Sequence, residues 1–200
     1  MLRKSTYSQI FLFAALAMLF PLTVDATTIA SVKLENLFSQ ADQVVLVKIV
    51  AADDEHYETA VYKAQVELAY KGAASGETIY FGPFVGYALG NEYLLFLRTG
   101  AGERANKNEG LSFGDITSVS RVMYEGYSSL AVGYECVFDG KDVEQQCDYS
   151  VQLNPEQVIL PESIPMFPKG DADAITNYKK WVRKNIFLSY LDDIAKAAHK

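Results

Sequence analysis

VVLVKIV (44–50), AVYKAQVELAY (60–70), TIYF (78–81) and YLLFL (93–97) are four apolar runs within the stretch from Asp42 to Leu97. They are rich in β-branched and aromatic residues, and polar or glycine-containing segments separate them. Such runs between turn residues are typical of successive β-strands, and short connections favour antiparallel pairing. Closing a small sheet of this kind into a barrel removes its exposed edges. The stretch therefore predicts a mainly β protein built on a small antiparallel barrel.

The clearest strand is expected between Tyr57 and Tyr70. Its residues alternate between an apolar set and a polar set, which we expect to face the core and the water respectively: Tyr62, Ala64, Val66 and Leu68 against Lys63, Gln65 and Glu67. A strand of this length cannot stay straight in a small domain, so we expect it to coil or to contain a bulge.

The first apolar run, 44–50, has apolar residues on both faces except at Lys48. This pattern indicates a strand buried on both sides, or a core strand covered by another element. A short helix is expected just before it, from Val32 to Gln40, with Ser31 as the N-cap.

The only two cysteines, Cys136 and Cys147, lie in β-like segments that we expect to form a hairpin (134–138 and 146–153). An Asp139-Gly140 turn would place Cys136 opposite Val143, whereas a direct bridge centres the loop on Lys141 and Asp142. We expect the bridge, because disulfide geometry tolerates little displacement. A metal site is the rival interpretation, but the usual ligand spacing is absent. We therefore expect a structural disulfide and no metal site.

Downstream of the hairpin, the short apolar run 158–160 is followed by Pro161, Pro165 and Pro168, which predict a stiff linker that cannot continue a sheet. A long C-terminal helix is expected next, capped by Asp171 or Asp173. Its apolar stripe changes face near Asn185, so we expect the helix to bend there or its halves to pack on different surfaces. We expect it to cover the barrel; the alternative is a membrane-surface or partner helix.

The segments ADQVVLV (41–47), YKG (70–72) and GNEYLLFL (90–97), with the preceding helix, resemble exported bacterial domains related to tissue inhibitors of metalloproteinases and the netrin-like module. The resemblance covers about a third of the chain and implies a five-stranded OB-type Greek-key barrel. The animal inhibitors chelate the target's zinc through an amino-terminal cysteine. Here the expected mature start is Thr27 and both cysteines lie far downstream, so that inhibitory activity does not carry over.

The N-terminus has the pattern of a secretory signal. Arg3 and Lys4 precede the apolar run 10–20, and small residues before Thr27 place cleavage after Ala26. The expected organisation is therefore a signal peptide (1–26), a barrel domain with a hairpin extension (27–160), and a linker with the C-terminal helix (161–200). We expect an exported, periplasmic or extracellular protein with no membrane span once the signal is removed.

The acidic balance of the chain argues against nucleic-acid partners. The net charge is −7 for the whole sequence, and removing the signal leaves 16 basic and 24 acidic residues, a net charge of −8. An acidic domain repels phosphate backbones.

The sequence offers little support for a catalytic site. GLSFG (110–114) matches the nucleophile-elbow pattern around Ser112, but that chemistry needs a strand before the serine and a helix after it. The bases available, His56 and His199, are poorly placed in the chain. The acidic clusters lack calcium-loop spacing. We expect no catalytic residues and no cofactor.

Phe84 and Tyr87 lie in a glycine-flanked loop, where aromatic residues either form a contact surface for a partner or fold back to cap the barrel. Capping is favoured, and the loop is kept as a possible partner-contact site. The sequence thus predicts an exported, non-enzymatic binding module for a protein or cell-envelope partner. The alternatives are a non-chelating protease inhibitor and a serine hydrolase built on Ser112.

Overall fold

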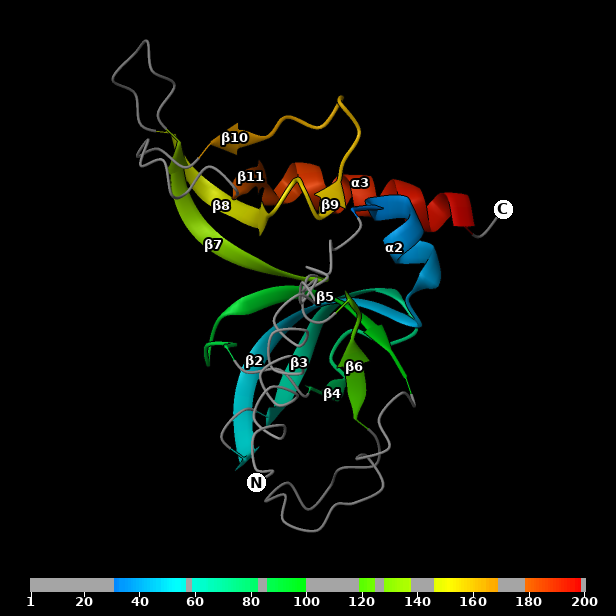
Figure 1. Ribbon diagram of the computed structural model, residues 1–200, viewed down its shortest axis with the longest axis vertical. Coiled ribbons are helices and arrows are strands. Elements are labelled where there is room, and N and C mark those ends of the chain that lie inside the picture. The colour runs from blue at the N-terminus through cyan, green and yellow to red at the C-terminus, as the bar shows by residue number, and fades with distance from the viewer. Residues whose placement is uncertain are drawn as a thin grey trace, which may run out of the picture.

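The computed structural model describes residues 31–56, 59–82, 86–99, 119–124, 128–137, 146–168 and 179–198 (Figure 1). Its elements, in chain order, are β1 (Val32–Lys33), α2 (Leu34–Gln40), β2 (Gln43–His56), β3 (Thr59–Lys71), β4 (Thr78–Gly82), β5 (Glu92–Arg98), β6 (Ser120–Val122), β7 (Ser129–Val137), β8 (Gln146–Leu153), β9 (Val158–Ile159), β10 (Phe167–Pro168), β11 (Lys180–Arg183) and α3 (Lys184–Ala198).

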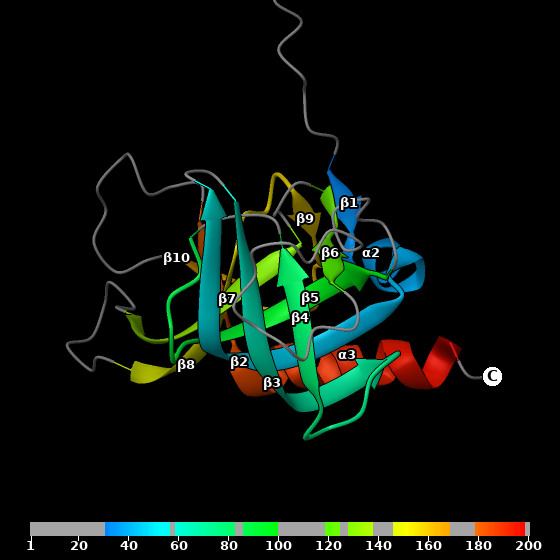
Figure 2. The same ribbon diagram turned by 90° about the horizontal axis from the view of Figure 1, so that it is seen from below.

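Five strands close into a barrel in the order β5-β2-β3-β4-β6, and β6 also pairs with β5. Because β5 returns to lie beside β2 instead of β4, the connection is a Greek key. The β4–β6 pair is parallel and the other pairs of the barrel are antiparallel. Figure 2 shows β2, β3 and β4 as neighbouring strands of the barrel wall. The predicted mainly β, OB-like barrel is confirmed.

Alternate residues of the barrel strands fill its interior, as the period of two requires. They are mostly aliphatic, with aromatic rings at one end: Val45, Val47, Ile49, Ala60, Tyr62, Ala64, Val66, Ile79, Phe81, Tyr93, Leu95, Leu97 and Val122. The predicted burial of Tyr62, Ala64 and Val66 is therefore confirmed.

The predicted burial of Leu68 is wrong, and a β-bulge is the reason. Leu46 pairs with Leu68 and Val47 pairs with Val66, so Glu67 is an extra residue in β3. A bulge shifts the alternation of side chains by one position. Ala69 consequently packs against the barrel interior, while Leu68 is 43% exposed.

The polar side of β3 follows the prediction with one exception. Gln65 and Glu67 are exposed, but Lys63 is partly buried. The Lys63 ammonium lies 5.5 Å from the centre of the Tyr80 ring, so its aliphatic stem runs along the neighbouring strand β4.

A second core lies on the outer face of β2 and β5, so residues 44–47 of β2 are buried on both faces, as the apolar run 44–50 predicted. The prediction is wrong at Val50, which is 50% exposed and lies in neither core. Side chains from α2, β7, β8, β11 and α3 cover this face. The cluster includes Leu34, Leu37, Phe38, Val44, Leu46, Leu94, Phe96, Leu130, Val132, Val151, Leu153, Val182, Phe187 and Leu191.

β5 connects the barrel to a second layer of strands. The edge of β5 opposite β2 is shared: Leu97 and Arg98 pair with β6, and Glu92–Leu95 pair with β7. From β7 the sheet continues through β8 and β11 to β10. Figure 1 shows β2 and β7 diverging on either side of β5, so the sheet forks at this strand.

The predicted C-terminal helix is half wrong. Its proposed caps, Asp171 and Asp173, lie outside the described residues, but Lys180–Arg183 forms strand β11 and the helix α3 starts only at Lys184. β11 pairs antiparallel with β8, so Val182 enters the second core while Trp181 points to the other face. The apolar stripe changes near Asn185 because a strand becomes a helix there.

Three smaller corrections concern element ends. Pro168 belongs to the edge strand β10, where a missing N–H costs no ladder hydrogen bond. Ser31 does not cap α2, because Val32 and Lys33 first pair in parallel with β9. β2 continues to His56, so the strand predicted from the apolar run 44–50 extends through the acidic residues 53–55.

Candidate functional site

The disulfide lies on a part of the sheet that extends past both cores. β7 pairs with β5 only as far as Val132, and β8 pairs with β11 only from Ser150. Residues 133–137 and 146–149 therefore form a two-stranded ribbon. Within the described residues, the two strands of the ribbon pair with each other and have no further strand on their outer edges. We refer to these residues as the ribbon.

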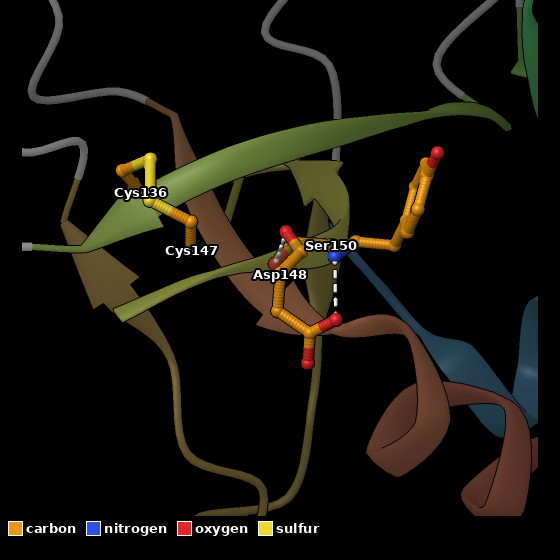
Figure 3. The surroundings of a disulfide bond; sticks show 5 residues. Cys136, Cys147, Asp148 and Ser150 are labelled. Carbon is orange, nitrogen blue, oxygen red and sulfur yellow. Dashed lines mark hydrogen bonds between the residues drawn. A yellow bond between two sulfur atoms is a disulfide. The ribbon is translucent and has the colours of Figure 1, made fainter. Parts of the chain in front are cut away.

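Cys136 and Cys147 face each other across the ribbon with a Cα–Cα distance of 3.9 Å and form the predicted bridge (Figure 3). This register centres the connection on Lys141 and Asp142, within residues 138–145, which lie outside the described part. The register implied by a tight Asp139-Gly140 turn is thereby excluded.

Two exposed tyrosines share the face of the ribbon that carries the bridge. Tyr134 lies directly opposite Tyr149, and their ring centres are 5.4 Å apart in an edge-to-face arrangement with an interplanar angle of 71°. Tyr134 is 62% exposed and Tyr149 is 53% exposed. The rings hold each other in place yet present apolar surface and two hydroxyl groups to solvent.

A charged pair separates these tyrosines from the second core. Lys184, the first residue of α3, forms a salt bridge with Glu92, the first residue of β5. The Lys184 ammonium also lies 5.8 Å from the centre of the Tyr149 ring. Lys184 brings a positive charge to the N-terminal end of α3, which the helix dipole disfavours, and Glu92 neutralises that charge.

The opposite face of the ribbon is acidic. Glu135 lies directly opposite Asp148, and neither carboxylate forms an ion pair within the described ranges. The Asp148 carboxylate accepts a hydrogen bond from the Tyr149 amide at 2.8 Å (Figure 3). Nearer the core, this face is covered by Trp181, whose ring would lie 3.9 Å from a Cβ at Gly133. The ribbon thus has an aromatic face and an acidic face.

Tyr87 folds back into the barrel, in the arrangement that the sequence favoured. Its ring centre lies 4.9 Å from that of Tyr62, 5.1 Å from Phe81 and 5.0 Å from Tyr93. Burial raises the pKa of Tyr87 to about 12. Phe84, the other residue of the possible partner-contact loop, lies outside the described residues.

Tyrosine hydroxyls fix the backbone of this loop. The amides of Gly86 and Tyr87 donate to the Tyr62 hydroxyl at 3.1 and 3.4 Å, and the Ala88 amide donates to the Tyr93 hydroxyl at 3.0 Å. These hydrogen bonds hold residues 86–88 against the aromatic cluster of Tyr62, Phe81, Tyr87 and Tyr93.

A shallow depression of about 590 Å³ lies between α3 and the segment that contains Ser163 and Ile164. Asn185, Ser189 and Asp193 supply most of its polar groups. These are hydrogen-bonding groups without a nucleophile and base pair, so the depression carries no catalytic assignment.

The remaining sequence candidates are not brought together. Ser112 and His199 lie outside the described residues. Among the residues that the structure describes, no group of three or more His, Cys, Asp or Glu side chains could hold a metal ion, and no helix is long and apolar enough to cross a membrane.

Sequence reasoning missed the tyrosine pair, although a signal for it was present. Counting two residues inward from the bridge along each strand places Tyr134 opposite Tyr149. The Lys184–Glu92 pair had no such signal, because its partners belong to different elements far apart in the chain.

No family model, curated protein or solved structure matches this chain.

Proposed function

We propose that this chain is an exported, non-enzymatic binding module for a protein or cell-envelope component, and that the ribbon is its contact surface. Export is supported by the secretory pattern of residues 1–26 and by the Cys136–Cys147 disulfide, which requires an oxidising environment to persist.

The observation that carries the proposal is the exposure of the Tyr134–Tyr149 pair on a covalently fixed ribbon. Tyrosine provides a large contact area with little conformational entropy to lose, and it is enriched among residues that dominate binding energy. Here each tyrosine ring packs against the other, and the nearby disulfide restrains the two strands that carry them. The cost of ordering them on binding is therefore small.

The test uses the purified chain with its disulfide formed and an isolated cell-envelope fraction, with binding measured by co-sedimentation over a range of chain concentrations. The double substitution Tyr134→Ser and Tyr149→Ser is expected to weaken binding about tenfold or more, as loss of two central aromatic contacts would. Tyr124→Ser is the matched control, because Tyr124 is also an exposed tyrosine (41%) but lies after β6, outside the ribbon.

A second control separates the two candidate surfaces. Leu89 is 62% exposed beside the loop of Tyr87, so Leu89→Ser should leave binding unchanged if the ribbon is the contact surface. Unchanged binding of the ribbon double variant, together with loss in Leu89→Ser, would move the site to that loop. Absence of saturable binding by the unmodified chain would refute the binding module.

A further inference from the structure

We infer that the free edge of β7, residues 133–137, binds an extended peptide segment of a partner protein as an additional antiparallel strand, with a basic residue of that segment facing Glu135. The inference rests on the proposed function and identifies the chemical class of the partner. Recognition of this kind takes affinity from main-chain hydrogen bonds and specificity from alternate side chains.

The edge is open because the sheet forks. Glu92 is the last residue of β5 that pairs with β7, and in the described part of the chain β7 continues past it without a neighbour on that side. Figure 1 shows β7 and β2 diverging from β5. The corresponding edge of β8 is less accessible: α3 begins where β11 ends, and Lys184 lies over the Tyr149 ring.

The register determines which backbone groups face the open edge. In antiparallel pairs the closely spaced positions are those that do not exchange hydrogen bonds, and the Cys136–Cys147 Cα distance of 3.9 Å identifies such a position. Tyr134, two residues away, has the same parity. The N–H and C=O groups of Tyr134 and Cys136 therefore point away from β8 and toward the incoming strand.

Charge at this edge selects the occupant. Glu135 and Asp148 are like charges directly opposite each other, an arrangement that destabilises a strand pair. A residue opposite Glu135 on the added strand would occupy a closely spaced position, where side chains interact most strongly. A lysine or arginine there relieves the repulsion, and its neighbours along the strand would pack beside Tyr134 and the disulfide. The expected segment therefore places one basic residue between two apolar residues.

The same charges disfavour a second copy of this chain. Pairing two β7 edges antiparallel, in the register that uses all of residues 133–137, places Glu135 opposite Glu135 of the second copy. This adds a further like-charge contact to the one already present with Asp148. The edge is better matched to a basic strand of a different protein.

The experiment selects random linear peptides displayed on phage against the oxidised chain and measures the best peptide by fluorescence polarisation. Tyr134→Pro and Tyr134→Ser both remove the ring, but only proline removes the edge N–H and blocks strand addition. We expect Tyr134→Pro to bind about tenfold more weakly than Tyr134→Ser. Tyr149→Pro and Tyr149→Ser form the matched pair on β8 and should bind equally.

A charge exchange tests the same edge without a proline. Glu135→Lys is expected to weaken binding of a peptide with a central lysine by about fivefold or more, and replacing that lysine with glutamate should restore binding to the variant. Far-ultraviolet circular dichroism and a thiol assay confirm that each variant is folded and bridged.

Three outcomes overturn the inference: no peptide is enriched, the two Tyr134 variants bind equally, or the charge exchange gives no rescue. The proposed function has a separate readout, which is saturable envelope binding that depends on Tyr134 and Tyr149. If that binding is observed together with one of these three outcomes, the binding module remains and its partner belongs to a different chemical class. Loss of envelope binding by the unmodified chain would remove both.

Discussion

The bulge in β3 leads to a quantitative prediction about two leucines, each of which lies in one of the four apolar runs that predict the barrel. Leu95 lies inside the barrel with no exposed surface, whereas Leu68 follows the extra residue Glu67 and is 43% exposed. We expect Leu95→Ala to destabilise the protein strongly and Leu68→Ala to do so weakly. The two variants carry the same chemical change, so the difference between them reports the side-chain environment.

The expected magnitudes follow from burial. Replacing leucine by alanine removes about three methylene equivalents, or about 2.4 kcal/mol of transfer free energy when all are buried. At Leu95 the cavity left in the barrel raises this to about 3–5 kcal/mol. At Leu68 just over half of the side chain is buried and solvent can fill the space, so the cost is about 1.4 kcal/mol or less.

Equilibrium urea unfolding measures both costs, with Trp181 fluorescence and far-ultraviolet circular dichroism as independent probes. Trp181 is the only tryptophan and is 5% exposed, so its emission reports loss of the second layer of strands. Coincident transitions from the two probes would justify a two-state free energy. Costs within about 0.5 kcal/mol of each other would show that the alternation is not shifted and that Leu68 faces the core.

Three further predictions concern the ribbon and the barrel end. Replacing Cys136 and Cys147 by serine should cost up to about 3 kcal/mol in the chain-entropy model. Hydrogen exchange should rise in the ribbon while the barrel stays protected, and thiol titration of the native chain should find no free cysteine. Lys184→Met should cost about 1 kcal/mol in urea unfolding by leaving Glu92 unpaired beside the core, and Glu92→Gln in that background should recover part of it. Since burial raises the pKa of Tyr87 to about 12, the folded chain retains this proton between about pH 10 and 12 while the unfolded chain releases it. The free energy of unfolding should therefore fall as pH rises across that window and be unaffected by this group below it, with a shallower fall in Tyr87→Phe.

The period of the hydrophobic residues predicted the strands of the barrel. This was possible because the alternation of buried and exposed side chains along a strand is visible in the local sequence. The structure confirms two-sided burial for residues 44–47 and the alternation from Tyr62 to Val66. The alternation fails at Leu68 because the bulge depends on how β3 meets β2, which no local pattern records. β11 was predicted as helix for a related reason: pairing with β8 overrides the helical spacing of its apolar residues.

The candidate site divides in the same way. The disulfide was predictable from two cysteines in a chain whose N-terminus has a secretory signal pattern, and the tyrosine pair follows once that bridge fixes the register. The open edge of β7 was not predictable, because it depends on where β5 ends relative to β7. Whether a strand has an open edge depends on contacts between segments that are distant in the sequence. The chemistry of the side chains along that edge can be read directly from the sequence.

The disulfide and the exposed tyrosines are linked by the position of the ribbon outside both cores. Neither the barrel interior nor the second core includes Tyr134 or Tyr149, so burial does not hold the ribbon together. A two-stranded hairpin whose side chains do not pack into a core is marginal in water. The Cys136–Cys147 bridge supplies the constraint that a core would otherwise supply, and it does so while leaving the tyrosine rings and the β7 edge uncovered. A surface constrained in this way can bind without first being ordered, and because the bridge lies outside both cores we expect reduction to affect the ribbon alone.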